Sequence, residues 1–283
     1  MDAKQLLSQL PSQFQGQLSP LTSGLTNQSW RLTTPHARFW LRLGHVASES
    51  LGIDRQQELL AHQAAAQAGL SPKVRYAQPS QGILILDWLS EPHWQAPFFS
   101  LTKTHLARLA TQVAKLHQLA PAVTSINLMA RAEFYLCQLS DLSADLLHLA
   151  RSFEQSSLNL DYVPVFCHHD LNAANIMGAR PWLLDWEYAG LGDAAFELAV
   201  IADSFKLTEQ GEQHLLASYK NSGAPMSERR FQARKPWVQW LSLLWAKVQY
   251  QHTAQATYQT IEHQARSQLR SQLKRYFQQP LAD

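Results

Sequence analysis

Between residues 167 and 187 short apolar runs alternate with acidic and amide side chains, which restricts the segment to short strands joined by tight loops. Asp170 follows one apolar run, Asn175 stands five residues later, and Asp185 ends the run at 182–184. Loops on a rigid scaffold are where functional side chains are commonly presented. We therefore expect neighbouring strands to bring Asn175 and Asp185 together, with Asp170 facing the same cavity.

These three side chains suit one kind of chemistry. Mg²⁺ takes hard oxygen ligands and keeps several waters, so one amide, one carboxylate and the phosphates of a substrate are sufficient for it. Phosphoryl transfer needs little beyond positioning and charge neutralisation, with a further carboxylate to orient the hydroxyl. A single Asp or Asn in a loop is usually a turn former or a helix cap. The joint pattern favours Asp170 as catalytic base and Asn175 and Asp185 as magnesium ligands, with His168 supporting the loop.

The composition predicts a globular enzyme that has neither nucleic acid nor membrane as a partner. Of 283 residues 46% are hydrophobic and 16% charged, and the net charge is +2. Such a charge gives no strong attraction to either polyanion. The chain lacks the ~20-residue apolar run of a membrane span, its start lacks a signal peptide's apolar centre, and two cysteines make no disulfide framework. We expect a cytoplasmic monomer or homodimer.

Local patterns divide the chain into two lobes and predict an α+β fold. Strand-like runs lie at 18–21, 28–33, 38–43, 74–77 and 82–88, with a helix at 54–68. Later helical patterns lie at 104–119, 130–155, 194–205, 212–220, 227–251 and 257–278, and strand-like runs at 163–166, 175–177 and 182–186. These patterns predict a small lobe with an antiparallel sheet and a helix, residues 1–88, and a larger, mostly helical lobe, residues 89–283.

The small lobe is expected to supply a phosphate clamp. A loop between two strands contains Gly24, Thr26 and Asn27, whose backbone N–H groups suit a phosphate. An ordinary hairpin turn would have a similar sequence. Arg42 on the third strand is a candidate fixed cation, and Glu58 on the next helix is the candidate partner that holds it. On spacing alone, a surface ion pair explains these two residues equally well.

As a set, the motifs resemble the aminoglycoside phosphotransferase and choline kinase superfamily, a branch of the protein-kinase-like fold. The likeness extends from about residue 21 to about residue 203 and is greatest to the choline/ethanolamine kinase and bacterial thiamine kinase branches. The matching motifs are Gly24-Leu25-Thr26-Asn27, Arg55-x-x-Glu58, Ile85-Leu86-Asp87-Trp88-Leu89, His168-x-Asp170-x-x-x-x-Asn175 and Asp185-Trp186-Glu187.

The resemblance implies a bilobal kinase that uses ATP and Mg²⁺, with a nucleotide-binding small lobe and a catalytic, substrate-binding large lobe. It gives the base, the metal ligands and the clamp pair the roles stated above. It also implies that Leu86 and Trp88 lie in the hinge that receives adenine, and that Glu187 contacts metal or substrate. Protein kinases have lysine at the position of Arg42, whereas choline and thiamine kinase relatives often have arginine. Many antibiotic kinases have histidine where this chain has Asn172.

Three other interpretations compete with phosphoryl transfer. Residues 190–195 imitate a dinucleotide-binding fingerprint, but no second strand with an acidic end follows. Asp193 is better explained as the N-cap of a helix that begins at Ala194. The second alternative is a hydrolase in which His168, His169, Asp170 and Asp185 bind a transition metal. The two histidines are poor joint ligands, because adjacent side chains of an extended chain point apart. A non-catalytic nucleotide-binding regulatory protein is the third alternative, although binding alone does not require all three polar groups.

Aromatic residues give a second indication of the substrate, after the resemblance. Aromatic faces attract quaternary ammonium and thiazolium cations. The candidate acceptor contacts are Trp186, Glu187, Tyr188, Trp245 and Tyr250. Trp237 and Trp240 lie on one helical stripe and are more simply explained as core. Together with the resemblance, these residues indicate a small alcohol as acceptor, namely choline, ethanolamine or thiamine, with an aminoglycoside or a sugar as the alternative.

Overall fold

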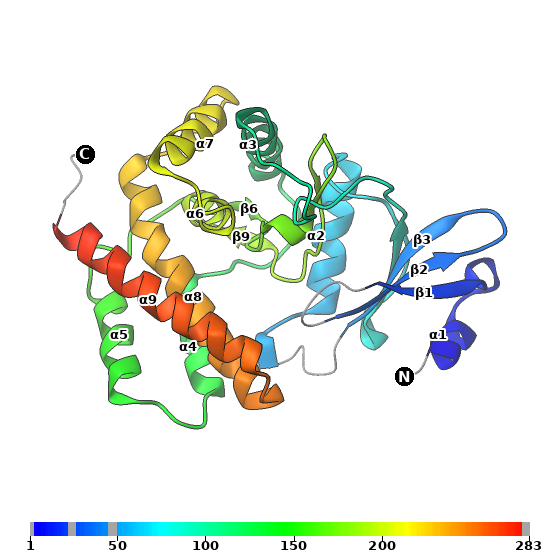
Figure 1. Cartoon of the computed structure of the whole chain (residues 1–283), viewed down its shortest axis with the longest axis horizontal. Helices are drawn as coiled ribbons and strands as arrows, with labels where there is room; N and C mark the ends of the chain where they lie inside the picture. The colour runs from blue at the N-terminus through cyan, green and yellow to red at the C-terminus, as the bar shows by residue number, and fades with distance from the viewer. Residues whose placement is uncertain (1–2, 22–26, 45–49, 279–283) are drawn as a thin grey trace.

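An antiparallel sheet forms the N-terminal lobe, and helices make up most of the rest of the chain (Figure 1). The computed structural model describes residues 3–21, 27–44 and 50–278. The five strands lie in the order β1-β2-β3-β5-β4, and every neighbouring pair is antiparallel. Their bounds are β1 Gln17–Leu21, β2 Gln28–Thr33, β3 Arg38–Leu43, β4 Val74–Gln78 and β5 Ile83–Asp87. The predicted small antiparallel sheet is confirmed.

An N-terminal segment that the sequence patterns did not predict packs on this sheet. It consists of α1 (Ala3–Gln9) and the short 3-10 helix η1 (Ser12–Phe14). The apolar cluster of this lobe is formed by Leu6, Leu10, Phe14, Leu32, Leu41, Ile83 and Ile85. All four side chains of the run at 83–86 are buried. Burial of this kind is needed because a few strands alone are only marginally stable in water.

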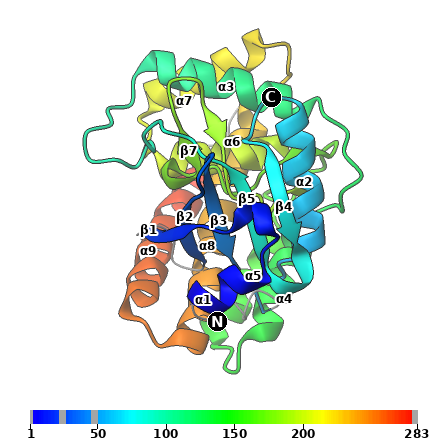
Figure 2. The same cartoon turned by 90° about the vertical axis from the view of Figure 1, so that its right-hand side faces the viewer.

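The helix α2 (Arg55–Gln67) lies beside the sheet and is reached directly after β3 (Figure 2). Asp54 caps it by accepting hydrogen bonds from two backbone N–H groups of the first turn, at 2.8 and 3.2 Å. Ala61 and Ala65 of α2 belong to the apolar cluster of the large lobe. The helix therefore connects the two lobes, and the expected domain boundary after residue 88 remains a prediction.

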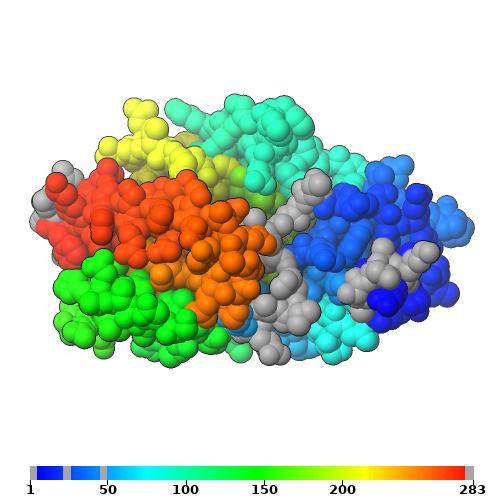
Figure 3. Space-filling model, turned by 60° about the horizontal axis from the view of Figure 1, so that its bottom comes forward, coloured from blue at the N-terminus to red at the C-terminus, as the bar shows by residue number. Residues whose placement is uncertain are grey.

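The large lobe is built from helices around an aromatic core. The helices are α3 Lys103–His117, α4 Leu128–Gln138, α5 Ala144–Glu154, α6 Ala194–Ser204, α7 Glu209–Asn221, α8 Glu228–Thr253 and α9 Ala256–Gln278. Phe153 stacks on Trp240 with ring centres 5.6 Å apart and meets Trp237 edge-on at 4.6 Å. Both tryptophans are buried, which confirms their assignment to the core. Figure 3 shows α9 on the surface of this lobe, with the sheet at the opposite end.

The expected single helix at 130–155 is wrong, because the chain breaks it into α4 and α5. Ser140 donates to the amide oxygen of Gln251 from its backbone nitrogen and its hydroxyl, at 2.8 and 2.9 Å. Ser143 then caps α5 by accepting a hydrogen bond from the backbone of Leu146. Serine side chains compete for backbone groups in this way and so favour helix ends over helix interiors.

Two short two-stranded antiparallel sheets lie in the middle of the chain. In one, β6 (Val165–Cys167) pairs with β9 (Gly190–Gly192), and in the other β7 (Ile176–Met177) pairs with β8 (Trp182–Leu183). The strand β9 was not predicted. A Cβ on its last glycine would collide with the ring of His169, so packing explains the glycine there. Within 3–21, 27–44 and 50–278, no helix is both long enough and apolar enough to cross a membrane.

Candidate active site

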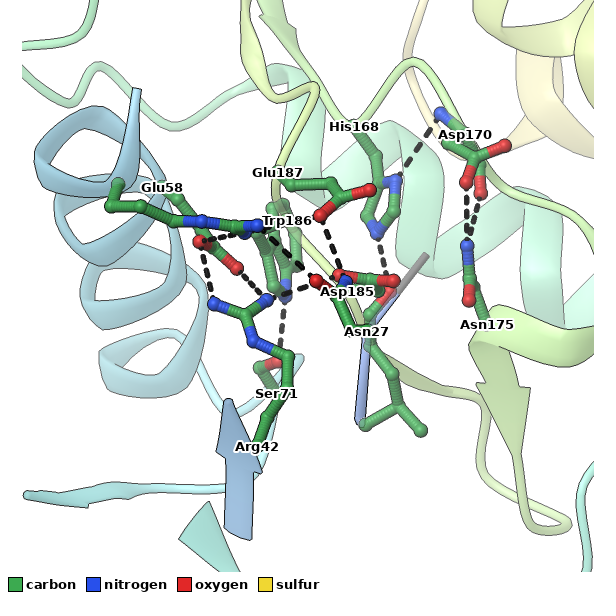
Figure 4. A network of polar contacts seen from close by, with 12 residues as sticks. Asn27, Arg42, Glu58, Ser71, His168, Asp170, Asn175, Asp185, Trp186 and Glu187 are labelled. Atoms are coloured by element: carbon green, nitrogen blue, oxygen red, sulfur yellow. Dashed lines mark hydrogen bonds and ion pairs between the residues drawn. The ribbon is translucent and has the colours of Figure 1, made fainter. Parts of the chain in front are cut away.

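The β7–β8 hairpin brings Asn175 and Asp185 together. Ile176 is paired with Leu183, and the backbone nitrogen of Leu184 donates to the carbonyl oxygen of Asn175 at 2.9 Å. The two polar side chains therefore leave neighbouring backbone positions, and Asp170 approaches from the loop that precedes β7 (Figure 4). The side chains of Asp170, Asn175 and Asp185 therefore come together at the β7–β8 hairpin, as expected.

Asp170 is held by two amide side chains. Asn172 Nδ2 donates to Asp170 Oδ1 at 3.0 Å, and Asn175 Nδ2 donates to Asp170 Oδ2 at 2.8 Å. Asn175 Nδ2 also donates to the backbone carbonyl of Asp170 at 2.9 Å. Because its nitrogen is used in this way, the amide oxygen of Asn175 is the atom that can bind a cation.

The two aspartates have pKa values well above those of ordinary carboxyl groups. Burial is the main cause for Asp170, whose pKa is raised to about 7 against the hydrogen bonds from Asn172 and Asn175. Burial and then the charge of Glu187 raise the pKa of Asp185. Asp185 also has a φ of 63°, a left-handed conformation that costs about 1–2 kcal/mol for a residue with a Cβ. Such strain and such pKa shifts are typical of functional sites.

Arg42 and Glu58 form a buried ion pair across the small lobe. Arg42 Nη2 donates to Glu58 Oε2 at 2.8 Å, and Arg42 Nη1 donates to Glu58 Oε1. Their exposed fractions are 2% and 3%, so the alternative of a surface ion pair is wrong. Burial by itself raises the pKa of Glu58, but Arg42 and Arg55 hold it at about 2. Arg42 Nη1 also lies 3.4 Å from Asp185 Oδ1, which links the two lobes.

Arg55 is a site residue whose role the sequence patterns did not reveal. Its Nη1 donates to Glu58 Oε2 at 2.9 Å and to Glu187 Oε2 at 3.1 Å, while Nη2 donates to Asn27 Oδ1 at 3.2 Å. Asn27 Nδ2 in turn donates to Glu187 Oε2 at 3.0 Å, so Arg55, Asn27 and Glu187 are each hydrogen-bonded to the other two. A Cβ on Gly44 would lie within 2.9 Å of this guanidinium, so a side chain there would displace the guanidinium of Arg55. The three-residue spacing from Arg55 to Glu58 was the sequence feature that could have indicated this role of Arg55.

The charges of this network fit a divalent cation. The carboxylates are Glu58, Asp170, Asp185 and Glu187, and the guanidinium groups are those of Arg42 and Arg55. Four negative and two positive formal charges leave two negative charges over. A bound cation is often the largest local charge, and it lowers the pKa of carboxyl ligands whose pKa is raised in its absence. Oxygen donors of this kind match Mg²⁺.

His168 supports the loop, as expected. It is fully buried, and its Nε2 contacts the carbonyl oxygen of Leu184 at 2.7 Å. Glu197 of α6, which sequence reasoning missed, accepts hydrogen bonds from the backbone nitrogens of His168 and His169 at 2.5 and 3.1 Å. His169 Nδ1 contacts the carbonyl oxygen of Tyr188 at 3.0 Å. His168 Nδ1 also faces the backbone nitrogen of Asp170 at 3.3 Å, so both nitrogens of this ring are engaged and joint ligation of a transition metal by the two histidines is not supported.

Asp193 caps α6, as expected from the sequence. Its Oδ1 accepts a hydrogen bond from the backbone nitrogen of Ala195 at 2.9 Å. It is also paired with Arg230 at 2.7 Å and with Arg234 at 2.5 Å. Because the carboxylate of Asp193 is paired with two arginines, the start of α6 has a structural role. A dinucleotide phosphate is not expected to bind there.

The predicted acceptor contact at Trp186 is wrong. Its ring is fully buried and its Nε1 donates to Ser71 Oγ at 2.8 Å. Tyr188, by contrast, is half-buried, and its hydroxyl accepts a hydrogen bond from Trp245 Nε1 at 3.1 Å. Tyr250 is half-buried on α8, and in the described part of the chain no hydrogen bond or ring contact joins it to this pair.

The predicted nucleotide contacts are only partly described. Gly24 and Thr26 lie outside the described residues. Leu86 is buried in β5, so only its backbone can take part in a hinge. Trp88 follows β5 and is half-buried, with the guanidinium carbon of Arg31 6.0 Å from its ring centre.

The comparisons with known proteins agree with this geometry. Residues 17–232 match the model of the phosphotransferase enzyme family, APH, and the chain belongs to that family. It is 24% identical over 246 residues to the LicA protein of Haemophilus influenzae, covering 81% of this chain and 72% of LicA. It is 28% identical over 265 residues to thiamine kinase of Escherichia coli O157:H7, covering 87% of this chain and 88% of that enzyme.

Solved structures with this fold include other kinases. The choline kinase LicA from Streptococcus pneumoniae has a TM-score of 0.78 at 20% identity, covering 90% of this chain and 93% of that one. A choline/ethanolamine kinase family protein from Mesorhizobium loti has a TM-score of 0.77 at 23% identity, covering 96% and 93%. The protein-kinase-like α+β fold is therefore confirmed. The chain is a small-molecule phosphotransferase with an alcohol group as acceptor.

Proposed function

We propose that this phosphotransferase uses ATP and Mg²⁺ to phosphorylate the hydroxyl of choline, ethanolamine or thiamine. The observation that carries the proposal is the convergence of Asp170, Asn175 and Asp185 beside the Arg42–Glu58 pair, in a network with two negative charges to spare. Phosphoryl transfer requires this combination of base, metal ligands and fixed cation.

Asp170 is the proposed base, and Asn172 and Asn175 hold its carboxylate in position. The acceptor hydroxyl donates its hydrogen bond to Asp170 and transfers its proton there as the new O–P bond forms. At the same time the bond between the γ-phosphorus and the β–γ bridging oxygen breaks, which leaves ADP. Asn175 and Asp185 would hold Mg²⁺, which would neutralise the charges of the phosphates.

Arg42 is the proposed phosphate cation of the small lobe. Glu58 fixes its guanidinium from one side, so the cation is in place before the nucleotide arrives, which lowers the cost of ordering it. Gly24, Thr26 and Asn27 are proposed to contact the phosphates, and the backbone at Leu86 and Trp88 is proposed to receive adenine. A solved structure of the fold relative LicA contains AMP, which supports an adenine nucleotide as co-substrate.

The acceptor is proposed to bind next to Asp170, at Tyr188 and Trp245, with Tyr250 at the edge and Glu187 adding negative charge. Aromatic faces beside carboxylates favour cations, and the names of the LicA and thiamine kinase relatives agree with cationic alcohols. We also propose a cytoplasmic monomer or homodimer, with a nucleotide-binding domain at 1–88 and a catalytic domain at 89–283.

The proposal is tested by a coupled ADP-release assay with choline, ethanolamine, thiamine and kanamycin as acceptors. We expect turnover on at least one of the first three, and none in the presence of EDTA. Turnover on kanamycin alone would replace the acceptor assignment with an aminoglycoside. Intact ATP binding without turnover on any alcohol would favour a regulatory role and contradict the proposal.

A further inference from the structure

Arg131 of α4 places a positive charge among the aromatic residues of the candidate acceptor site. Its guanidinium carbon lies 5.9 Å from the ring centre of Tyr135 and 5.7 Å from that of Tyr188. A cation is attracted to an aromatic face within about 6 Å of its centre. Arg131 Nη1 also donates to the carbonyl oxygen of Leu51 at 3.0 Å. The guanidinium is thus held by three different groups.

Both tyrosines lie close enough to the reacting groups to sense their charge. Tyr188 directly follows Glu187 in the chain and accepts the hydrogen bond from Trp245. Burial is the main cause that raises the pKa of both phenols, Arg131 lowers that of Tyr135, and the negative charges of Glu187 and Asp170 raise both. The two rings and the carboxylates therefore share one region of the large lobe.

Electron-rich ring faces near carboxylates make a favourable position for a cation. In this structure that cation belongs to the protein itself. A cationic alcohol that binds here needs the same ring faces, and two positive charges a few ångström apart repel each other. We propose that Arg131 is an internal competitor of the acceptor, whose guanidinium occupies the cation position between Tyr135 and Tyr188 and must leave before a cationic alcohol binds. Only the identity of the acceptor rests on the proposed function.

The surroundings of Arg131 make its displacement possible. The side chain is partly exposed, so it can swing into water without unfolding α4. Gly52, next to Leu51, has a φ of 67°, and a Cβ there would lie 3.0 Å from Arg131 Nη1. This glycine lets the connection to α2 approach the guanidinium closely. An Arg–Tyr pair four residues apart is common on a helix surface, but Leu51 and Tyr188 come from two other segments and converge on the same group.

The experiment measures how Arg131→Ala changes the use of charged and uncharged acceptors. Since a cation–aromatic contact accounts for about 0.5–2 kcal/mol, we expect the KM for choline to fall about two- to thirty-fold, with kcat and the KM for ATP unchanged. The uncharged analogue 3,3-dimethylbutan-1-ol should gain much less. The matched control is Arg108→Ala, since Arg108 likewise donates to a backbone carbonyl, that of Ala179 at 3.0 Å. It should leave every constant unchanged.

A direct binding measurement separates this inference from the choice of acceptor. The Kd of tetramethylammonium, measured by calorimetry, should fall in Arg131→Ala by the same factor as the KM for choline. An unchanged or higher Kd would overturn the proposal, as would an equal gain for the uncharged analogue. If the wild type phosphorylates none of the alcohols but the Kd still falls, the acceptor assignment fails and the role of Arg131 stands. Arg131→Gln, which keeps a polar helix-forming side chain, should behave in the same way.

Discussion

Asn175 donates from one nitrogen both to the carboxylate of Asp170, at 2.8 Å, and to its backbone carbonyl, at 2.9 Å. The proposed base and a proposed metal ligand are therefore fixed to each other. A change in the position of one is transmitted to the other, so the hydroxyl-binding and metal-binding parts of the site form one rigid unit.

Asp170→Asn is expected to lower kcat by about 10²–10⁴, the usual contribution of a general base. The KM for ATP should change less than twofold, because Asp170 lies on the acceptor side of the site. Steady-state kinetics with saturating magnesium test this. Near-normal turnover in the variant would show that another group takes the proton.

Asp185→Ala is expected to remove the magnesium dependence of nucleotide binding. The variant loses the carboxylate that faces Arg42 at 3.4 Å, so ATP should bind equally weakly with and without Mg²⁺ in calorimetry. Asp203→Ala is the control, since that carboxylate is paired with the exposed Lys206 away from the site. An Asp185→Ala protein that still responds to Mg²⁺ would contradict the ligand assignment.

Arg55→Ala is expected to raise the KM for ATP about tenfold, because it releases Asn27 and Glu187 from one shared cation. A charge-assisted hydrogen bond contributes about 1.5–3 kcal/mol, which is enough for such a change. Arg55→Lys should recover only part of the loss, since an ammonium lacks the planar fork that spans two partners. Equal kinetics for wild type and Arg55→Ala would mean that the bridge has no role in nucleotide binding.

The contribution of Asp170 to the stability of the metal-free protein is expected to fall as the pH rises from about 4 to about 7. The pKa of Asp170 is raised from 3.8 in the unfolded chain to about 7 in the folded one, so the folded state binds its proton more tightly. That stabilisation is complete below pH 4 and is lost by pH 7, by roughly 2–4 kcal/mol. In urea denaturation with EDTA, Asp170→Asn should exceed the wild type in stability at pH 8 far more than at pH 5. Parallel pH profiles would contradict the shift.

Glu58→Ala is expected to destabilise the fold by about 3–5 kcal/mol, because it leaves the guanidinium of Arg42 buried without its main partner. The matched control is Asp87→Ala, which removes an equally close arginine partner from the exposed Arg75. An exposed pair contributes no more than about 1 kcal/mol. Chemical denaturation of both variants provides the comparison, and losses of similar size would show that burial of the Arg42 pair does not matter.

Sequence patterns predicted those parts of the candidate site whose structure depends on residues close together in the chain. The spacing of Asp170, Asn175 and Asp185 within short strands was enough to place them together. The prediction that Trp186 contacts the acceptor failed, because Asp185 adopts a left-handed conformation with a φ of 63°. That turn ends the alternation of side chains along the strand and directs the ring of Trp186 into the core. The residue types around Asp185 did not indicate a positive φ there.

Contacts between distant segments were beyond any local pattern. Arg55 and Glu187 are 132 positions apart, and their pairing depends on how α2 lies against the large lobe. Glu197 holds the backbone of the loop that carries Asp170, a role that no local pattern indicated. The helix α1 was missed because its seven residues gain their stability from packing on the sheet rather than from a helical pattern.

Glu58 accepts hydrogen bonds from both Arg42 and Arg55, and this sharing restricts how the enzyme can evolve. One carboxylate on α2 sets the positions of the cation facing the proposed nucleotide site and of the cation facing Glu187. A substitution in α2 that adapts one of these functions therefore disturbs the other. We expect descendants with new acceptors to have diverged in α4 and α8, while the first turn of α2 stayed nearly invariant.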